Sequence, residues 1–139
     1  MAIQKRTSVE GLALATSANG TTRNGANLSV EQVALQSLVM ECTSKITTSS
    51  VVATFVAQGS VDGTTWFDLK SLENPSAVTT AAGTGTEVVT TLALIVPANA
   101  SAYPLVRCNA KLSGASTAAA DKTQVTYRFV QPGGLQQVM

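Results

Sequence analysis

Two segments near the end of the chain alternate between apolar and polar residues, and this alternation limits what the chain can fold into. They span residues 103–112 and 122–130. Their apolar positions are Val106, Cys108, Ala110, Leu112, Val125, Tyr127 and Phe129. Successive side chains of a strand point to opposite faces, so a period of two indicates antiparallel strands with one buried face.

Five further segments have the composition of strands, at 11–16, 34–42, 51–61, 65–69 and 86–96. No sustained helical pattern with caps separates them. Residues 28–36 are the best helical candidate, with Ser29 as N-cap, and a strand that enters the next segment is the alternative. Seven to eight short strands without helices between them predict an all-β fold, an antiparallel β-sandwich of the immunoglobulin-like or jelly-roll-like kind.

Three parts of the chain differ in composition. Residues 1–28 contain a polar, Gly/Asn-rich stretch, so we expect an extended N-terminal arm that could include a short edge strand. Residues 29–131 form the predicted β-sandwich domain, and residues 132–139 form a C-terminal tail. A long loop is expected at 71–86, where Pro75 interrupts the sequence. Long loops and tails cost ordering entropy, so these segments are either arms that lie on neighbouring subunits or disordered.

The sequence contains no histidine, which removes the commonest general base and the Ser-His-Asp and Cys-His arrangements. Of the eight acidic residues, Asp62 and Asp68 are the pair of most interest. Asp62 and Gly63 form the strongest two-residue signal for a hairpin turn, which makes Asp62 a turn residue and puts Asp68 on the next strand. The sequence therefore predicts no enzyme and no catalytic residues.

Two other segments lack what a ligand site needs. The stretch around Asp62 does not have the closely spaced oxygen ligands of a calcium loop. Residues 83–86, Gly-Thr-Gly-Thr, have neither the lysine nor the following helix of a phosphate loop. We predict no cofactor and no metal ion.

Cys42 and Cys108 both fall on inward-facing positions of predicted strands. Trp66 lies between them, the Cys–Trp–Cys order of immunoglobulin domains, but the first gap is longer than in that fold. We expect no signal peptide, so two reduced, buried thiols are predicted, with a disulfide as the alternative. Trp66 and Phe67 are neighbours on one strand, so only one can face the core. The other is either covered by the 71–86 loop or exposed as a contact.

The charge of the chain argues against several partners. The net charge is +1 without a basic stripe, and aromatic residues make up only 4%, so nucleic-acid binding has little support. No segment approaches the length of a transmembrane helix, so no membrane partner is expected. Charged residues make up 12%, about half the usual level. A surface so poor in charge is either covered by a partner or a neutral surface of Thr and Ser.

Residues 58–69, QGSVDGTTWFDL, followed by 103–114, YPLVRCNAKLSG, and 122–129, KTQVTYRF, resemble small β-sandwich proteins of tailed-bacteriophage virions. The resemblance covers roughly residues 35–130. It implies a virion accessory role, such as head decoration, neck or fibre, and it supplies no catalytic residues.

The function expected from this resemblance is a capsid decoration (cement) protein that binds and stabilises the phage head shell through its sandwich edges and terminal arms. The implied partners are the major capsid protein or other virion subunits, and the protein itself would be a homo-oligomer, with a trimer favoured. Its expected location is the virion, after synthesis in the host cytoplasm without secretion. The alternative is a carbohydrate- or receptor-binding β-sandwich module of a phage tail or fibre or of a bacterial surface protein.

Overall fold

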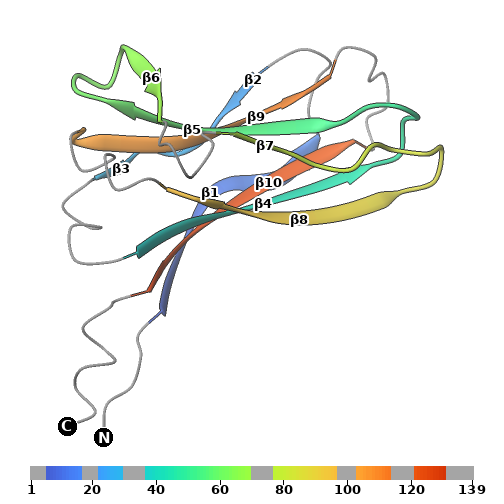
Figure 1. Ribbon diagram of the computed structural model, residues 1–139, viewed down its shortest axis with the longest axis horizontal. Helices are drawn as coiled ribbons and strands as arrows, with labels where there is room; N and C mark the ends of the chain where they lie inside the picture. Colours follow the sequence, from blue (N-terminus) through green and yellow to red (C-terminus); the bar gives the residue numbers. More distant parts are fainter. Residues whose placement is uncertain are drawn as a thin grey trace, which may run out of the picture.

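The computed structural model describes residues 6–16, 22–29, 37–69, 77–96, 103–113 and 121–130. These residues form two antiparallel β-sheets that pack face to face (Figure 1). The first sheet has the order β1 (Arg6–Thr16), β10 (Lys122–Val130), β4 (Ser37–Ile46), β8 (Val88–Ile95). The second has the order β2 (Thr22–Asn24), β9 (Leu105–Leu112), β5 (Ala53–Ser60), β6 (Trp66–Asp68), with β3 (Leu28–Ser29) on β9 and β7 (Ala77–Thr79) on β5. The predicted all-β sandwich is confirmed.

The described residues form ten strands, more than the seven to eight expected. The additional strands are β2, β3 and β7, each two or three residues long, and so short a strand leaves no readable alternation in the sequence. β7 lies inside the predicted 71–86 loop and pairs with β5. Residues 28–29 are strand, so they favour the strand alternative for 28–36, of which residues 30–36 lie outside the described part.

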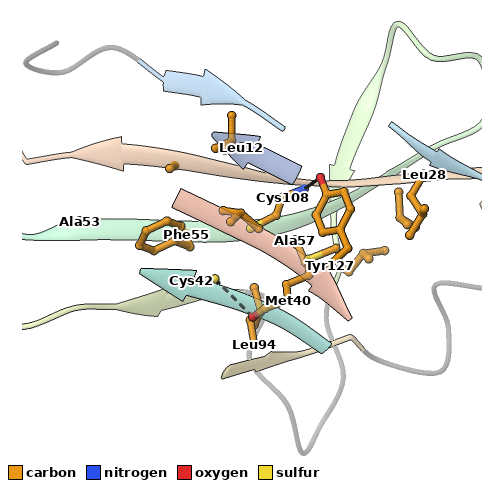
Figure 2. Close-up of a cluster of buried hydrophobic side chains, with 14 of the residues drawn as sticks. Leu12, Leu28, Met40, Cys42, Ala53, Phe55, Ala57, Leu94, Cys108 and Tyr127 are labelled. Carbon is orange, nitrogen blue, oxygen red and sulfur yellow. Dashed lines mark hydrogen bonds between the residues drawn. The ribbon is translucent and has the colours of Figure 1, made fainter. Parts of the chain in front are cut away.

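The core lies between the sheets and follows the predicted alternation. Its largest fully buried side chains include Tyr127, Phe55 and Met40, which come from strands of both sheets (Figure 2). The inward positions of β9 that the alternation predicted are all buried: Val106, Cys108, Ala110 and Leu112. Burial of apolar area at about 25 cal/mol per Å² makes this interface the main source of stability.

The segment before residue 30 contributes strands to both sheets. β1 is an 11-residue edge strand of the first sheet, longer than the short strand expected from 11–16, and β2 and β3 pair with β9 in the second sheet. Irregular register near Glu10 and Leu12 shows bulges in β1. The division of the chain into arm, domain and tail stays a prediction, whereas these pairings tie 6–16 and 22–29 to the sandwich.

Arg23 of β2 fastens the second sheet to the first. Its Nη1 donates to the backbone oxygen of Thr123 at 2.7 Å and to the Thr123 hydroxyl at 2.8 Å. Its Nη2 donates to the backbone oxygen of Ala13 at 2.8 Å. Partial burial lowers the pKa of the Arg23 guanidinium from its ordinary value. Hydrogen bonds from a charged donor to backbone oxygens are among the stronger ones, so Arg23 helps to hold β1 and β10 against β2.

Tyr127 of β10 makes the corresponding link inside the core. Its hydroxyl accepts from the backbone N–H of Cys108 at 3.0 Å (Figure 2). It donates to the backbone oxygen of Ala26 at 2.7 Å. Ala26 N–H in turn donates to the backbone oxygen of Gly11 at 2.8 Å. The phenol therefore connects β10, β9 and the N-terminal segment at one point.

No helix among the described residues is long and apolar enough to cross a membrane.

Candidate interaction surfaces

A connected group of polar side chains lies on the outer face of the second sheet, centred on Gln58 of β5. In the strand register Gln58 stands between Asp68 of β6 and Arg107 of β9. Its Oε1 accepts hydrogen bonds from Arg107 Nε at 3.2 Å, from Arg107 Nη2 at 3.1 Å and from Asn109 Nδ2 at 2.6 Å. Its Nε2 donates to Asp68 Oδ1 at 3.0 Å. We name these four residues and Trp66 the outer polar cluster.

The bonds of the outer polar cluster fix which way each amide points. Arginine can only donate, so the Gln58 atom beside Arg107 must be oxygen, and its nitrogen then faces the acceptor Asp68. Since Gln58 Oε1 accepts, the Asn109 atom beside it must be the nitrogen. The Asn109 oxygen therefore points away from Gln58, and a surface hollow of about 190 Å³ lies beside both residues, lined also by Asp68 and Lys111.

Trp66 also belongs to this face. The Arg107 guanidinium lies 4.0 Å from the centre of its ring, a cation–π contact that leaves the indole half-buried. Phe67 points to the other side and is 51% exposed, with its ring stacked on Tyr103 at a centroid distance of 6.2 Å. Neither ring lies in the core, so the expectation that one of them faces it is wrong: Trp66 is partly covered by Arg107, and Phe67 is exposed.

Asp62 is a turn residue, as the sequence predicted, but the turn is not the two-residue type. Ser60 pairs with Trp66, so five residues connect β5 to β6, and only Gly63 has a positive φ, of 78°. Asp62 Oδ1 accepts from the backbone N–H groups of Thr64 and Thr65, both at 2.8 Å. These bonds lower the pKa of Asp62 from its ordinary value. The carboxylate organises the loop, while Asp68 bonds to Gln58 on the sheet.

The Gly-Thr-Gly-Thr segment at 83–86 packs along residues 47–51. The backbone N–H groups of Gly83 and Gly85 donate to the carbonyls of Val51 and Thr47, at 3.0 and 2.8 Å. Gly85 has a φ of 89°, which favours glycine. These two N–H groups have backbone partners and do not face outward for a phosphate group. This end of the predicted 71–86 loop is therefore held to residues 47–51 by backbone hydrogen bonds.

Cys42 and Cys108 are free and buried, as expected for reduced thiols that act as small apolar side chains (Figure 2). They come from opposite sheets, β4 and β9. The neighbouring Cys108 thiol and the burial of Cys42 raise the pKa of the Cys42 thiol. A high pKa keeps a thiol protonated and unreactive.

β8 forms one edge of the first sheet. It pairs with β4 on one side, and among the described strands none pairs with its other side. Its eight residues, VVTTLALI, contain no charged residue and no proline. Val89 is 56% exposed on it. Proteins usually protect long edge strands with charge, proline or bulges, and β8 has none of these within its span.

No family model and no curated protein matches the sequence. Among solved structures, a chain from the structure of infectious bursal disease virus, Gx strain, is similar over 94% of this chain, with a TM-score of 0.53 and 11% identity. A chain of the infectious bursal disease virus VP2 subviral particle covers 94% of this chain at 17% identity and a TM-score of 0.47, and 33% of its own length is matched.

A chain from Bacillus endospore appendages, described as disulfide-linked pili, covers 92% of this chain and 84% of its own length at 12% identity and a TM-score of 0.37. The last two TM-scores are below 0.5, so the fold likeness rests on the first structure. At this identity the likeness shows the fold alone: the protein is an antiparallel β-sandwich of a kind that also occurs in a virus. The chain spans about a third of the virus chain that it resembles, with 32% of that chain matched. The resemblance to tailed-bacteriophage proteins stays a prediction.

Proposed function

We propose that the protein is a non-enzymatic structural subunit of a virion, and most specifically a capsid decoration (cement) protein. The observation that carries the proposal is the open, uncharged edge of β8. A free edge presents a row of backbone N–H and C=O groups to which a strand of another chain can add. The low charge of the chain and the β-sandwich that it shares with a chain from a virus support the same role.

In this proposal β8 adds a strand of a second copy or of the shell. The partners are the major capsid protein or other virion subunits, and the protein forms a homo-oligomer, with a trimer favoured. The opposite edge, β1, is less suited to pairing, since it carries Arg6 and Glu10 and has bulges. The proposed location is the virion, after synthesis in the host cytoplasm.

A charge placed on the β8 edge tests the proposal. Ala93 is exposed on β8, opposite Glu41 of β4, so Ala93→Lys adds a charge to the edge without removing a described contact. Leu14→Lys is the matched control, since it adds the same charge at a 38% exposed position on β1. Sedimentation measures the mass of each protein alone, and co-sedimentation with shells of the phage that encodes it measures capsid binding.

The expected result is an oligomer that binds shells, with both properties weakened at least tenfold by Ala93→Lys and unchanged by Leu14→Lys. A wild-type monomer that does not sediment with shells contradicts the proposal. Equal effects of the two substitutions contradict the role of β8.

The second candidate, a carbohydrate- or receptor-binding module, gains one specific observation. The outer polar cluster places Asp68 and Asn109 next to a hollow, on the face of the second sheet to which Trp66 also belongs. A monomer that ignores shells and binds a glycan would favour this function over the first.

A further inference from the structure

Two lysines stand directly opposite each other on the outer face of the first sheet. Lys45 of β4 and Lys122 of β10 are cross-strand partners, and the alternation of buried and half-buried residues on both strands puts their side chains on this face. Like charges directly opposite each other in a sheet are destabilising. Neither lysine side chain forms an ion pair or a hydrogen bond with another described residue. The described part of the chain therefore leaves this pair of positive charges without a neutralising group.

Two carboxylates lie on the same face, further along the strands. Glu41 of β4 and Glu10 of β1 flank Thr126 of β10 in the strand register. Arg128 places both on the outer face, because it bonds to Glu41 and to Ser8, which precedes Glu10 on the same side of β1. Glu10 is exposed, and its side chain has no bonded partner among the described residues. The carboxylates stand four residues from the lysines along the strands, which is about 13 Å.

The row between the two kinds of charge is uncharged. It consists of Gln124 of β10, Thr43 of β4 and Thr91 of β8, which are neighbours in the strand register. The hydroxyls of Thr43 and Thr91 are 3.0 Å apart and bond to each other. Threonine side chains are short, so a second sheet can approach this row to about 10 Å, the usual distance between stacked sheets.

A second copy of this face matches the charges when it is turned by half a turn about an axis that follows the uncharged row. The rotation reverses the direction of the strands and sets each strand opposite its own copy. Thr43 then faces Thr43 of the second copy, and Lys45 faces Glu41 of the second copy. Lys122 faces Thr126 of the second copy, which lies between the two carboxylates.

The face is also large enough for a weak dimer. Four strands about 4.8 Å apart, each with eight residues of about 3.3 Å, cover roughly 500 Å² per copy and roughly 1,000 Å² in a dimer. Specific interfaces begin at about this area. On β8 the same rotation sets Val89, which is 56% exposed, against Ala93 of the second copy, so an apolar contact accompanies the charge pairs.

We propose that the outer face of the first sheet is a self-complementary interface, at which two copies of this chain meet face to face with antiparallel strands. The lysine pair of each copy lies against the carboxylates of the other. The open backbone groups of β8 lie in the plane of the sheet, whereas this interface lies on its face. One copy can therefore use both surfaces, and the proposal goes beyond the assembly role.

Charge reversal tests the proposal. Sedimentation equilibrium of the full-length protein measures the dissociation constant of the dimer, which should rise when the ionic strength is raised from about 0.05 M to about 0.5 M. Lys122→Glu and Glu10→Lys should each weaken the dimer about tenfold, because each sets like charges together in both halves of the contact. A protein that carries both substitutions should regain the affinity. Lys111→Glu, exposed on the outer face of the second sheet, is the matched control and should change nothing.

A cross-link tests the register of the two copies. Thr43→Cys places a thiol on the axis, so a thiol-specific cross-linker with a spacer of about 10 Å should join two copies. Thr54→Cys is the matched control on the second sheet, since Thr54 also bonds to a threonine of the neighbouring strand, and it should not be joined. The native thiols of Cys42 and Cys108 are buried.

Three results would overturn the proposal. The first is a protein that stays monomeric at about 1 mM, the weakest affinity that matters for such a contact. The second is self-association that neither salt nor Lys122→Glu weakens, or that the double substitution does not restore. The third is equal cross-linking of Thr43→Cys and Thr54→Cys. None of these results touches the binding of shells through β8, which co-sedimentation measures separately.

Discussion

The Tyr127 hydroxyl accepts a hydrogen bond from the Cys108 backbone N–H at 3.0 Å, and this bond joins the first sheet to the second through the middle of the core. Cys108 already pairs with Ala57 in the register of β9 and β5. Cys108 is fully buried, so its N–H would be costly to leave without a partner, and the phenol oxygen is that partner.

Tyr127→Phe removes this link while it keeps the ring. The backbone N–H of Cys108 and the backbone oxygen of Ala26 then lose their bonds to the hydroxyl in a buried place, so the free energy of unfolding should fall by about 1–3 kcal/mol. Urea denaturation measures this change in the free energy of unfolding. Tyr103→Phe is the matched control and should change less, since Tyr103 is only half-buried. Equal effects of the two substitutions would show that the hydroxyl of Tyr127 does not stabilise the core.

Alkaline pH should destabilise the fold through Tyr127. Burial raises the pKa of its phenol above the ordinary value of about 10, so the folded state favours the neutral form. The unfolded chain loses this proton at a lower pH than the folded chain does. Stability is therefore fully present below about pH 10 and falls as the pH rises above it.

Spectroscopic titration of the tyrosine phenols measures the ionisation of Tyr127 and the loss of stability that accompanies it. Phenolate absorbance from Tyr127 should appear together with unfolding, and the corresponding part of the pH slope should be absent from Tyr127→Phe. Cys42, whose pKa is also raised, adds a slope of the same sign from about pH 8.5, and Cys42→Ala separates the two. A Tyr127 phenol that ionises in the folded protein near pH 10 would contradict the buried position.

Gly25→Ala should strain the N-terminal segment. A Cβ at Gly25 would lie 2.6 Å from the Tyr127 hydroxyl oxygen and would also collide with the backbone oxygen of Cys108. Backbone and core atoms must shift to make room, which costs about 1–3 kcal/mol. Gly85→Ala is the informative comparison: its Cβ meets no atom, and only the positive φ opposes it, at about 1 kcal/mol. Thermal unfolding that ranks Gly85→Ala as the more damaging change would contradict the packing of residue 25.

The two thiols should be protected in the native protein. Both are buried, so a thiol reagent should react with them only as fast as the fold opens, and denaturant should release two thiols per chain without a reductant. Cys42→Ala should leave one thiol per chain. Denatured wild-type protein that yields no thiol would instead show a disulfide between Cys42 and Cys108.

The sequence was sufficient to predict the layers of this fold but not all of its strands. β5 and β9 carry a buried face over eight residues and β10 carries one over residues 122–128, and an alternation of that length is readable without a structure. β2 and β3 are held by pairing with β9 and by Arg23, interactions with residues far along the chain. No local pattern contains that information.

The outer polar cluster shows the same limit for a site. The alternation placed Arg107 and Asn109 on the outer face, but it could not show that Gln58 lies between Arg107 and Asp68. That contact depends on the register of three strands, and a shift of one residue would move Gln58 to the other face. The signal available in the sequence was that two amides, Gln58 and Asn109, and one arginine, Arg107, all take outward positions of strands.

The pairing of Arg6 with Val130 brings the first residue of β1 beside the last residue of β10 (Figure 1). Partners across an antiparallel ladder have Cα atoms only about 5 Å apart. A short peptide could therefore join these two positions, and new ends could be opened at the exposed Val61–Thr65 loop. The chain is therefore a suitable candidate for circular permutation. A permuted protein would carry its ends between β5 and β6 of the second sheet, whereas the natural chain enters and leaves the sandwich at β1 and β10 of the first.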